Sequence, residues 1–264
     1  MLIDSNAYIG HWPFRERNYN TCDGLMTRMD EFGVDMSYVS SLTAIMYKNT
    51  QTANASLYRE IQGNSEAKRR LKPVAVINPI YGYGGWKDDY YTCIKEWEMS
   101  AIKIFPIYHR YDFNNEYCIE LVRMAAKDDI PVMIPIRMVD ARPSSWLDVE
   151  ESLSTNQIMG LVKQVPETKY ILQNVASGVS FSDENEKVFR NNQVWMDTSG
   201  RSMNEFHHLV ERFGVEKFVF GTHSPTLDYV TGLLRIESLY NSEANEADKE
   251  SIRATNIQKI FNHQ

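Results

Sequence analysis

The sequence alternates between short runs of aliphatic and β-branched residues and longer amphipathic segments. The expected strands are Met1–Gly10, Met36–Leu42, Leu71–Pro79, Ala101–Ile107, Ile130–Ile136, Tyr170–Gln173, Val194–Asp197 and Lys217–Gly221. Strands that are apolar on both faces and separated by helices are typical of a parallel sheet covered on both sides. Eight such units predict a (β/α)8 barrel. A doubly wound open sheet is the alternative, but its Gly-x-Gly-x-x-Gly turn does not follow the first strand.

Helical spacing of apolar residues fills the intervals between these strands. The expected helices are 21–32, 51–70, 88–99, 116–127, 156–164, 183–190, 203–213, 226–240 and 245–261. Thr21 or Asp23 can cap the first of them, and Gly33 ends it. With 264 residues and 43% hydrophobic content, we expect a single domain over residues 1–264.

Charge and cysteine content restrict the partners that this chain can have. The net charge is −7 and no basic run occurs, so we expect neither a nucleic-acid nor a membrane partner. Cys22, Cys93 and Cys118 are widely spaced, which indicates reduced thiols and a cytoplasmic protein. The 15 tyrosines and 5 tryptophans exceed the needs of a minimal core, so some of them can form a contact between copies in a homo-oligomer.

Polar side chains stand at the carboxyl end of nearly every expected strand. They are Asn6, Tyr8, Ser40, Asn78, Lys103, Arg137, Asn174, Asp197, Ser199 and His223. Because barrel enzymes place their chemistry at this end of the strands, the set predicts a site for a small anionic or polyhydroxylated molecule. In the first strand, alternation predicts that Asp4, Asn6 and Tyr8 point to the same face.

The first strand also resembles that of the amidohydrolase-related proteins, a group of the amidohydrolase superfamily. Their first strand reads Ile-Asp-x-His-x-His-x-Gly, and the two histidines bind a metal. Here the segment Ile3–Gly10 keeps this frame but has Asn6 and Tyr8 at the two histidine positions. The resemblance implies a metal-dependent-hydrolase type of barrel whose usual ligands are replaced.

Later segments continue the resemblance in the same order. Pro131–Pro135 resembles the fifth strand of the family and has Pro135 at the position of its ligand histidine. Asn174 stands where the sixth strand would end in histidine, and His223 stands at the aspartate of the motif after the eighth strand. The segments 194–200 and 252–261 resemble the seventh strand and the closing helix of the family.

These replacements bear directly on metal binding. The usual site holds a divalent cation with several imidazoles and a carboxylate, and the metal activates water. Amides, a phenol and a proline are poor zinc ligands, and His223 and His11 are the two imidazoles that remain for the site. We therefore expect no tightly bound metal and no other cofactor, although Asn and Asp oxygens can hold a weak divalent ion.

The leading functional hypothesis is an enzyme of the hydrolase, lactonase or decarboxylase type that acts on a small anionic substrate. His223 would be the general acid or base, with Tyr8 and Asn174 as the other catalytic groups. Lys103 and Arg137 should be neighbours at the rim and bind a carboxylate or phosphate, Arg137 through a bidentate contact. The remaining substrate-binding candidates are Asn6, Asn78, Ser199 and His11.

Two other hypotheses stay open. The replaced ligands also suit a non-catalytic small-molecule-binding or regulatory protein built on the same scaffold. Aromatic loops at residues 12–14 and 81–86 suit a structural subunit that packs against copies of itself.

Overall fold

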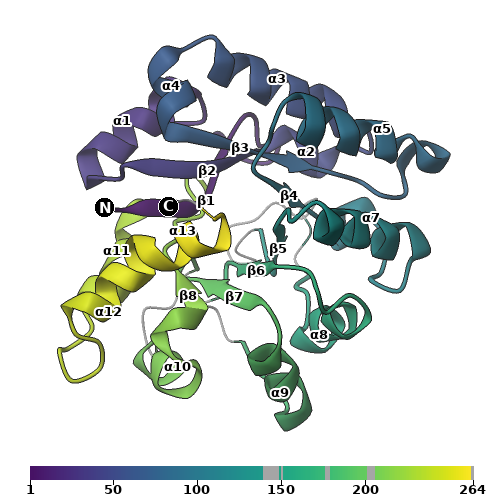
Figure 1. Cartoon of the computed structure of the whole chain (residues 1–264). Coiled ribbons are helices and arrows are strands. Elements are labelled where there is room, and N and C mark those ends of the chain that lie inside the picture. Colours follow the sequence, from purple (N-terminus) through teal and green to yellow (C-terminus); the bar gives the residue numbers. More distant parts are fainter. Residues whose placement is uncertain (139–148, 150, 176–178, 201–205, 263–264) are drawn as a thin grey trace.

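The computed structural model describes residues 1–138, 149, 151–175, 179–200 and 206–262. Eight parallel strands, each hydrogen-bonded to the next in chain order, form the sheet at the centre of the molecule (Figure 1). They are β1 (Ile3–Ile9), β2 (Met36–Ser41), β3 (Leu71–Val76), β4 (Ala101–Lys103), β5 (Val132–Pro135), β6 (Tyr170–Gln173), β7 (Val194–Asp197) and β8 (Phe218–Val219).

The sheet closes on itself between the last strand and the first. The amide of Ser5 donates to the carbonyl of Phe220 at 2.9 Å, and the amide of Tyr8 donates to the carbonyl of Ser224 at 2.8 Å. His223 completes the seam by donating its backbone N–H to the carbonyl of Asn6 at 2.7 Å. The predicted (β/α)8 barrel is therefore confirmed.

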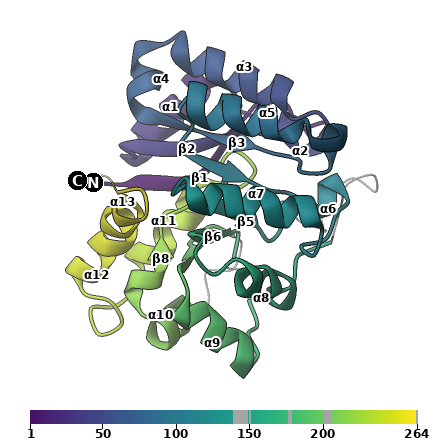
Figure 2. The same cartoon turned by 45° about the vertical axis from the view of Figure 1, so that its right-hand side comes forward.

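Helices surround the barrel on its outside, as the two views of the chain show (Figures 1 and 2). They are α1 (Cys22–Phe32), α2 (Thr43–Met46), α3 (Gln51–Gln62), α4 (Ser65–Arg70), α5 (Trp86–Tyr91), α6 (Pro106–His109), α7 (Glu116–Lys127), α8 (Thr155–Gln164), α9 (Asp183–Asn191), α10 (Phe206–Phe213), α11 (Tyr229–Glu237), α12 (Glu246–Glu250) and α13 (Asn256–Ile260). Across the described part of the chain, none of them is long and apolar enough to cross a membrane.

Several helix boundaries differ from the prediction for local reasons. The expected helix 51–70 is two helices, because Asn64 leaves the helical conformation and caps α4 by accepting from the amides of Glu66 and Ala67. Thr21 caps α1, and Gly33 ends it in the left-handed conformation at φ 66°, as predicted. The start of the expected helix 203–213 lies outside the described residues before Phe206.

A β-bulge interrupts the alternation of side chains in β1. The pairing register with β2 shifts between Asp4 and Ala7, so β1 contains one extra residue there. Ile3 belongs to the cluster that fills the barrel, whereas Ala7 packs with the residues between the strands and the helices. The expectation that Asp4 shares a face with Asn6 and Tyr8 is therefore wrong, because a one-residue insertion inverts the inside–outside phase of a strand.

The barrel interior is apolar at the amino ends of the strands. This layer comprises Ile3, Tyr38, Val74, Ala101, Met133, Ile171 and Val219. Helix α13 closes that end, since Ile257 and Ile260 pack into the same cluster and Phe261 stacks on Tyr38 at 4.1 Å between ring centroids. With one end filled by hydrocarbon, polar side chains of the interior gather toward the carboxyl ends of the strands.

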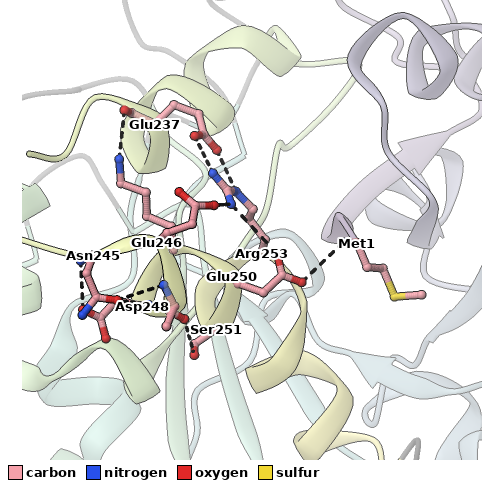
Figure 3. A network of polar contacts seen from close by, with 10 residues as sticks. Met1, Glu237, Asn245, Glu246, Asp248, Glu250, Ser251 and Arg253 are labelled. Atoms are coloured by element: carbon pink, nitrogen blue, oxygen red, sulfur yellow. Dashed lines mark hydrogen bonds and ion pairs between the residues drawn. The ribbon is translucent and has the colours of Figure 1, made fainter. Parts of the chain in front are cut away.

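Charged contacts hold the closing helices together on the outside (Figure 3). The guanidinium of Arg253 donates to Glu237 at the end of α11 and also pairs with Glu246 of α12. The amino terminus of Met1 lies 3.3 Å from Glu250. These contacts link the segment around α12 to the last helix before it and to the start of β1.

Candidate functional site

Asn6 is the centre of a buried polar cluster at the carboxyl ends of the strands. Its Nδ2 atom lies 2.9 Å from Asp197 Oδ2, 3.1 Å from Ser199 Oγ and 3.3 Å from His223 Nδ1. Its Oδ1 atom accepts a hydrogen bond from Lys103 Nζ at 3.1 Å. The bulge in β1 brings Asn6 into the barrel, and one amide then connects residues from β4, β7 and the segment after β8.

Lys103 ends β4 with its side chain inside the barrel and no exposed surface. Its ammonium group lies over the ring of Tyr8, 4.1 Å from the centroid, in addition to its bond with Asn6. Burial lowers the pKa of Lys103 to about 7, although Asp197 and Asp4 partly offset this effect. The amine can therefore gain or lose a proton near neutral pH.

Asp197 is the carboxylate that faces this lysine across Asn6. Its Oδ2 accepts from the hydroxyl of Ser199 at 2.6 Å, and its Oδ1 accepts from the amides of Asn174 at 2.9 Å and Ser199 at 3.1 Å. Burial raises the pKa of Asp197 to about 6 despite these hydrogen bonds. The Ser199 hydroxyl donates directly to Asp197, whereas in a Ser-His-Asp triad a histidine lies between the serine and the aspartate. These residues are therefore not arranged as such a triad.

Asp4 is the second buried carboxylate, and its partners lie at the seam of the barrel. Its oxygens accept from the hydroxyl of Thr222 at 2.6 Å, from the backbone amide of Thr222 at 3.0 Å and from the backbone amide of Asn6 at 2.9 Å. Burial raises the pKa of Asp4 to about 6. Two carboxyl groups and one amine that titrate near neutral pH thus occupy the same part of the barrel, a pattern that is typical of functional sites.

His223 lies beside Asn6, and its two ring nitrogens have different partners. Nε2 is 2.9 Å from the carbonyl of Met138, and Nδ1 faces the Asn6 amide. A carbonyl only accepts and an amide N–H only donates, so these contacts assign a neutral imidazole with its proton on Nε2. The ring also packs edge-on against Tyr8, with 5.2 Å between centroids.

A buried apolar group beside the cluster, called the apolar cover below, includes Tyr8, Trp12, Phe105 and Met138. Tyr8 makes the closest approach, because its ring contacts both Lys103 and His223 and its hydroxyl lies 3.7 Å from Met138 Sδ. Burial raises the pKa of the Tyr8 phenol well above its usual value. Asn6, Lys103 and His223 themselves have 0% exposed surface.

Other residues predicted for the site lie away from this hydrogen-bonded centre. Asn174 contributes its backbone amide to Asp197, but its side chain donates to the carbonyl of Arg137 at 2.6 Å. The Arg137 guanidinium donates to Ser152 Oγ at 2.9 Å, so the two predicted cations have separate partners. Asn78 donates to the carbonyl of Lys48 at 3.1 Å, and His11 is exposed.

The donor set does not fit a catalytic divalent metal. Acceptor atoms of Asp197, Ser199 and His223 converge on the Nδ2 atom of Asn6, which is a hydrogen-bond donor and cannot be a metal ligand. The neighbouring Lys103 amine would repel a cation when it is protonated. Among the residues that the structure describes, no three histidine, cysteine, aspartate or glutamate side chains are grouped as a metal site.

Solved structures with the same fold match nearly the whole chain. A 2,6-dihydroxybenzoate decarboxylase with 2,6-dihydroxybenzoate bound matches 99% of this chain over 99% of its own, with a TM-score of 0.75 and 13% identity. The chain therefore shares the (β/α)8 fold of this solved structure. A dihydroxybenzoic acid decarboxylase from Polaromonas sp. JS666 with manganese and 2-nitroresorcinol bound matches at a TM-score of 0.71 and 14% identity, covering 99% and 96% of the two chains. A candidate amidohydrolase from Staphylococcus aureus matches at 0.71 and 13%, covering 99% of each chain.

These likenesses lie at the level of the fold. A scan of protein-family profiles and a search of curated proteins by sequence give no match. The resemblance drawn from the strand motifs agrees with these likenesses at the level of the fold.

Sequence reasoning missed how central Asp197 and Asn6 are. Asp197 ends β7 and Asn6 lies within β1, and the bond between them spans 191 positions, so no local pattern reveals it. Met138 was missed altogether, because its backbone carbonyl, not its side chain, binds His223.

Proposed function

We propose that the protein is an enzyme that performs acid–base chemistry on a small carboxylate-bearing molecule, without a tightly bound metal. The observation that carries this proposal is the chain Lys103–Asn6–Asp197, in which an amine and a carboxyl with pKa values of about 7 and about 6 are joined through one amide. Such values near the working pH suit proton donors and acceptors.

Decarboxylation is the reaction that this arrangement suits best. When a carboxylate leaves as carbon dioxide, the carbon that held it needs a proton, and the Lys103 ammonium is a buried donor with a lowered pKa. Its positive charge would also stabilise the electron pair that develops. The decarboxylases of the same fold support this choice. Hydrolysis of an ester or lactone is the second reaction these groups would serve, with Asp197 as the base toward water.

Substrate has to reach the cluster from the side of the apolar cover. Tyr8 and Met138 meet there through a contact of 3.7 Å between the hydroxyl and the sulfur. These two side chains therefore have to move when substrate binds. Arg137, half-buried at the end of β5, is then the cation we propose for the substrate carboxylate, in exchange for its bond with Ser152.

The test is an activity screen with matched variants. Hydroxybenzoates and small hydroxy- and keto-acids are incubated with the protein, and carbon dioxide release and loss of substrate are followed. Lys103→Met and Asp197→Asn should each reduce kcat by at least about 100-fold. Arg137→Lys should mainly raise KM, because it keeps the charge and loses the planar fork. Turnover that survives in Lys103→Met would contradict the proposed role of this residue.

A non-catalytic role on the same scaffold is the second candidate. The observation that favours it is the complete burial of Asn6, Lys103 and His223, whose polar atoms already bond to one another. In that case the cluster would serve to hold the barrel together. Ligand binding without turnover across the screen, together with a large loss of stability in Asn6→Ala, would support this second candidate.

A further inference from the structure

A cavity of about 500 Å³ lies outside the barrel interior, between the carboxyl ends of β1 and β2 and helix α3. Its floor consists of Ile9, Ser41, Ala53 and Leu57, all of them buried. Cavities that bind small molecules typically measure about 300–1,000 Å³. The volume of this cavity therefore lies in the range of ligand sites, and it is far larger than the voids that imperfect packing leaves in a protein interior.

Helix α3 explains why the space stays open. It turns Thr52, Ala53, Ser56 and Leu57 toward the cavity, one stripe along the helix in which three of four side chains are small. Leu57 and Ala53 supply an apolar surface, while Thr52 and Ser56 supply hydroxyl groups. An apolar floor with a few hydroxyls around it is typical of a site for a small molecule with an apolar body.

Two charged side chains, Glu60 and Lys48, line the cavity, and only one of them already has a hydrogen-bond partner within the described part of the chain. Glu60 accepts a hydrogen bond from the backbone amide of Cys22 at 2.8 Å, so its carboxylate is engaged. The ammonium group of Lys48 has no hydrogen bond or ion pair with any residue that the structure describes. Asn78 holds the backbone of this lysine by donating to its carbonyl. The cavity is thus lined by a positive charge, that of Lys48, on a loop whose backbone is held in place.

We propose that this cavity is a small-molecule site, separate from the cluster around Asn6, for an apolar molecule that carries one acidic group. The apolar body lies on Ala53 and Leu57, and Lys48 pairs with the acid. Tyr47, whose exposed fraction is 61%, is the aromatic side chain beside that lysine and packs over the bound body. The site stands independently of the proposed reaction, because none of its residues belongs to the catalytic cluster.

Two fluorescent probes of the same shape test the site. The anionic probe is 8-anilinonaphthalene-1-sulfonate, and the uncharged one is N-phenyl-1-naphthylamine. Both should bind the folded protein at one site. Lys48→Gln should weaken the anionic probe about fivefold and change the uncharged probe less than about twofold, since an exposed ion pair contributes modestly. Lys187→Gln, an exposed lysine on α9, is the matched control and should change neither.

A second test fills the cavity with a large side chain. Ser56→Trp, at a solvent-accessible position that lines the cavity, should abolish binding of both probes. Thr52→Phe repeats the test if the first variant folds poorly by circular dichroism. Unchanged binding in the filled variants would overturn the site. If Lys48→Gln changed the affinity for both probes equally, Lys48 would not be the partner of an acidic group on the ligand. Because the readout is binding and Lys103 is untouched, failure here leaves the proposed reaction unaffected.

Discussion

Lys103 Nζ lies 3.1 Å from Asn6 Oδ1, and this contact joins the end of the fourth strand to the bulge of the first. The same amide turns its Nδ2 toward Asp197, so an amine and a carboxyl share one neutral bridge. A direct ion pair at this depth would require excellent geometry to offset desolvation. The amide instead keeps both groups hydrogen-bonded while their pKa values move toward neutrality.

Replacing Asn6 tests this bridge. Asn6→Ala leaves the buried Lys103 amine without its hydrogen bond and removes the donor shared by Asp197 and His223. We expect the free energy of unfolding to fall by about 3 kcal/mol. Urea denaturation measures the loss. Asn192→Ala, which removes a single, half-buried bond to the carbonyl of Val188, is the control and should cost about 1 kcal/mol.

The pH dependence of stability should report Lys103. Its pKa falls from 10.5 to about 7 on folding, so the unfolded chain binds the extra proton between these values. The contribution to stability is then complete above pH 10.5 and is lost as the pH falls toward 7. The difference in unfolding free energy between wild type and Lys103→Met should rise from pH 7 to pH 10. A flat difference over this range would show that the amine keeps its ordinary pKa.

The ring of Tyr8 should matter more than its hydroxyl. Tyr8→Phe removes only the weak contact with Met138 Sδ and should cost less than about 1 kcal/mol. Tyr8→Leu removes the aromatic face over Lys103 and should cost about 2–4 kcal/mol. It should also lower the pKa of Lys103 further, which NMR of ¹³C-labelled lysine can follow. Equal losses in both variants would assign the effect to the hydroxyl.

Metal content is the fourth prediction. Purified protein should contain far less than one zinc or manganese per chain, because an amide and an amine stand where cation ligands are needed. Elemental analysis gives the ratio directly, and treatment with a chelator should leave the thermal midpoint unchanged. Stoichiometric metal that a chelator removes, with a drop in that midpoint, would contradict this assignment and implicate His223 and Asp197.

The barrel followed from local patterns in the sequence. Segments such as Ile130–Ile136 and Tyr170–Gln173 are apolar on both faces, and only a parallel sheet covered by helices buries both. Thr21 and Gly33 mark the ends of α1 because capping depends on residues within one turn. The polar strand ends were also recognisable, since a strand delivers its last residues to a known edge of the barrel.

The tertiary structure alone decided which of those polar residues meet. The bulge between Asp4 and Ala7 inverted the phase of β1, and a one-residue shift of this kind leaves no mark in the hydrophobic pattern. Arg137 and Lys103 differ for a similar reason. Arg137 follows an apolar strand and Lys103 ends one, yet of the two Lys103 is fully buried and has its partner inside the barrel. Burial and distant partners set these pKa values and contacts, and both arise only when strands far apart in the chain close into one barrel.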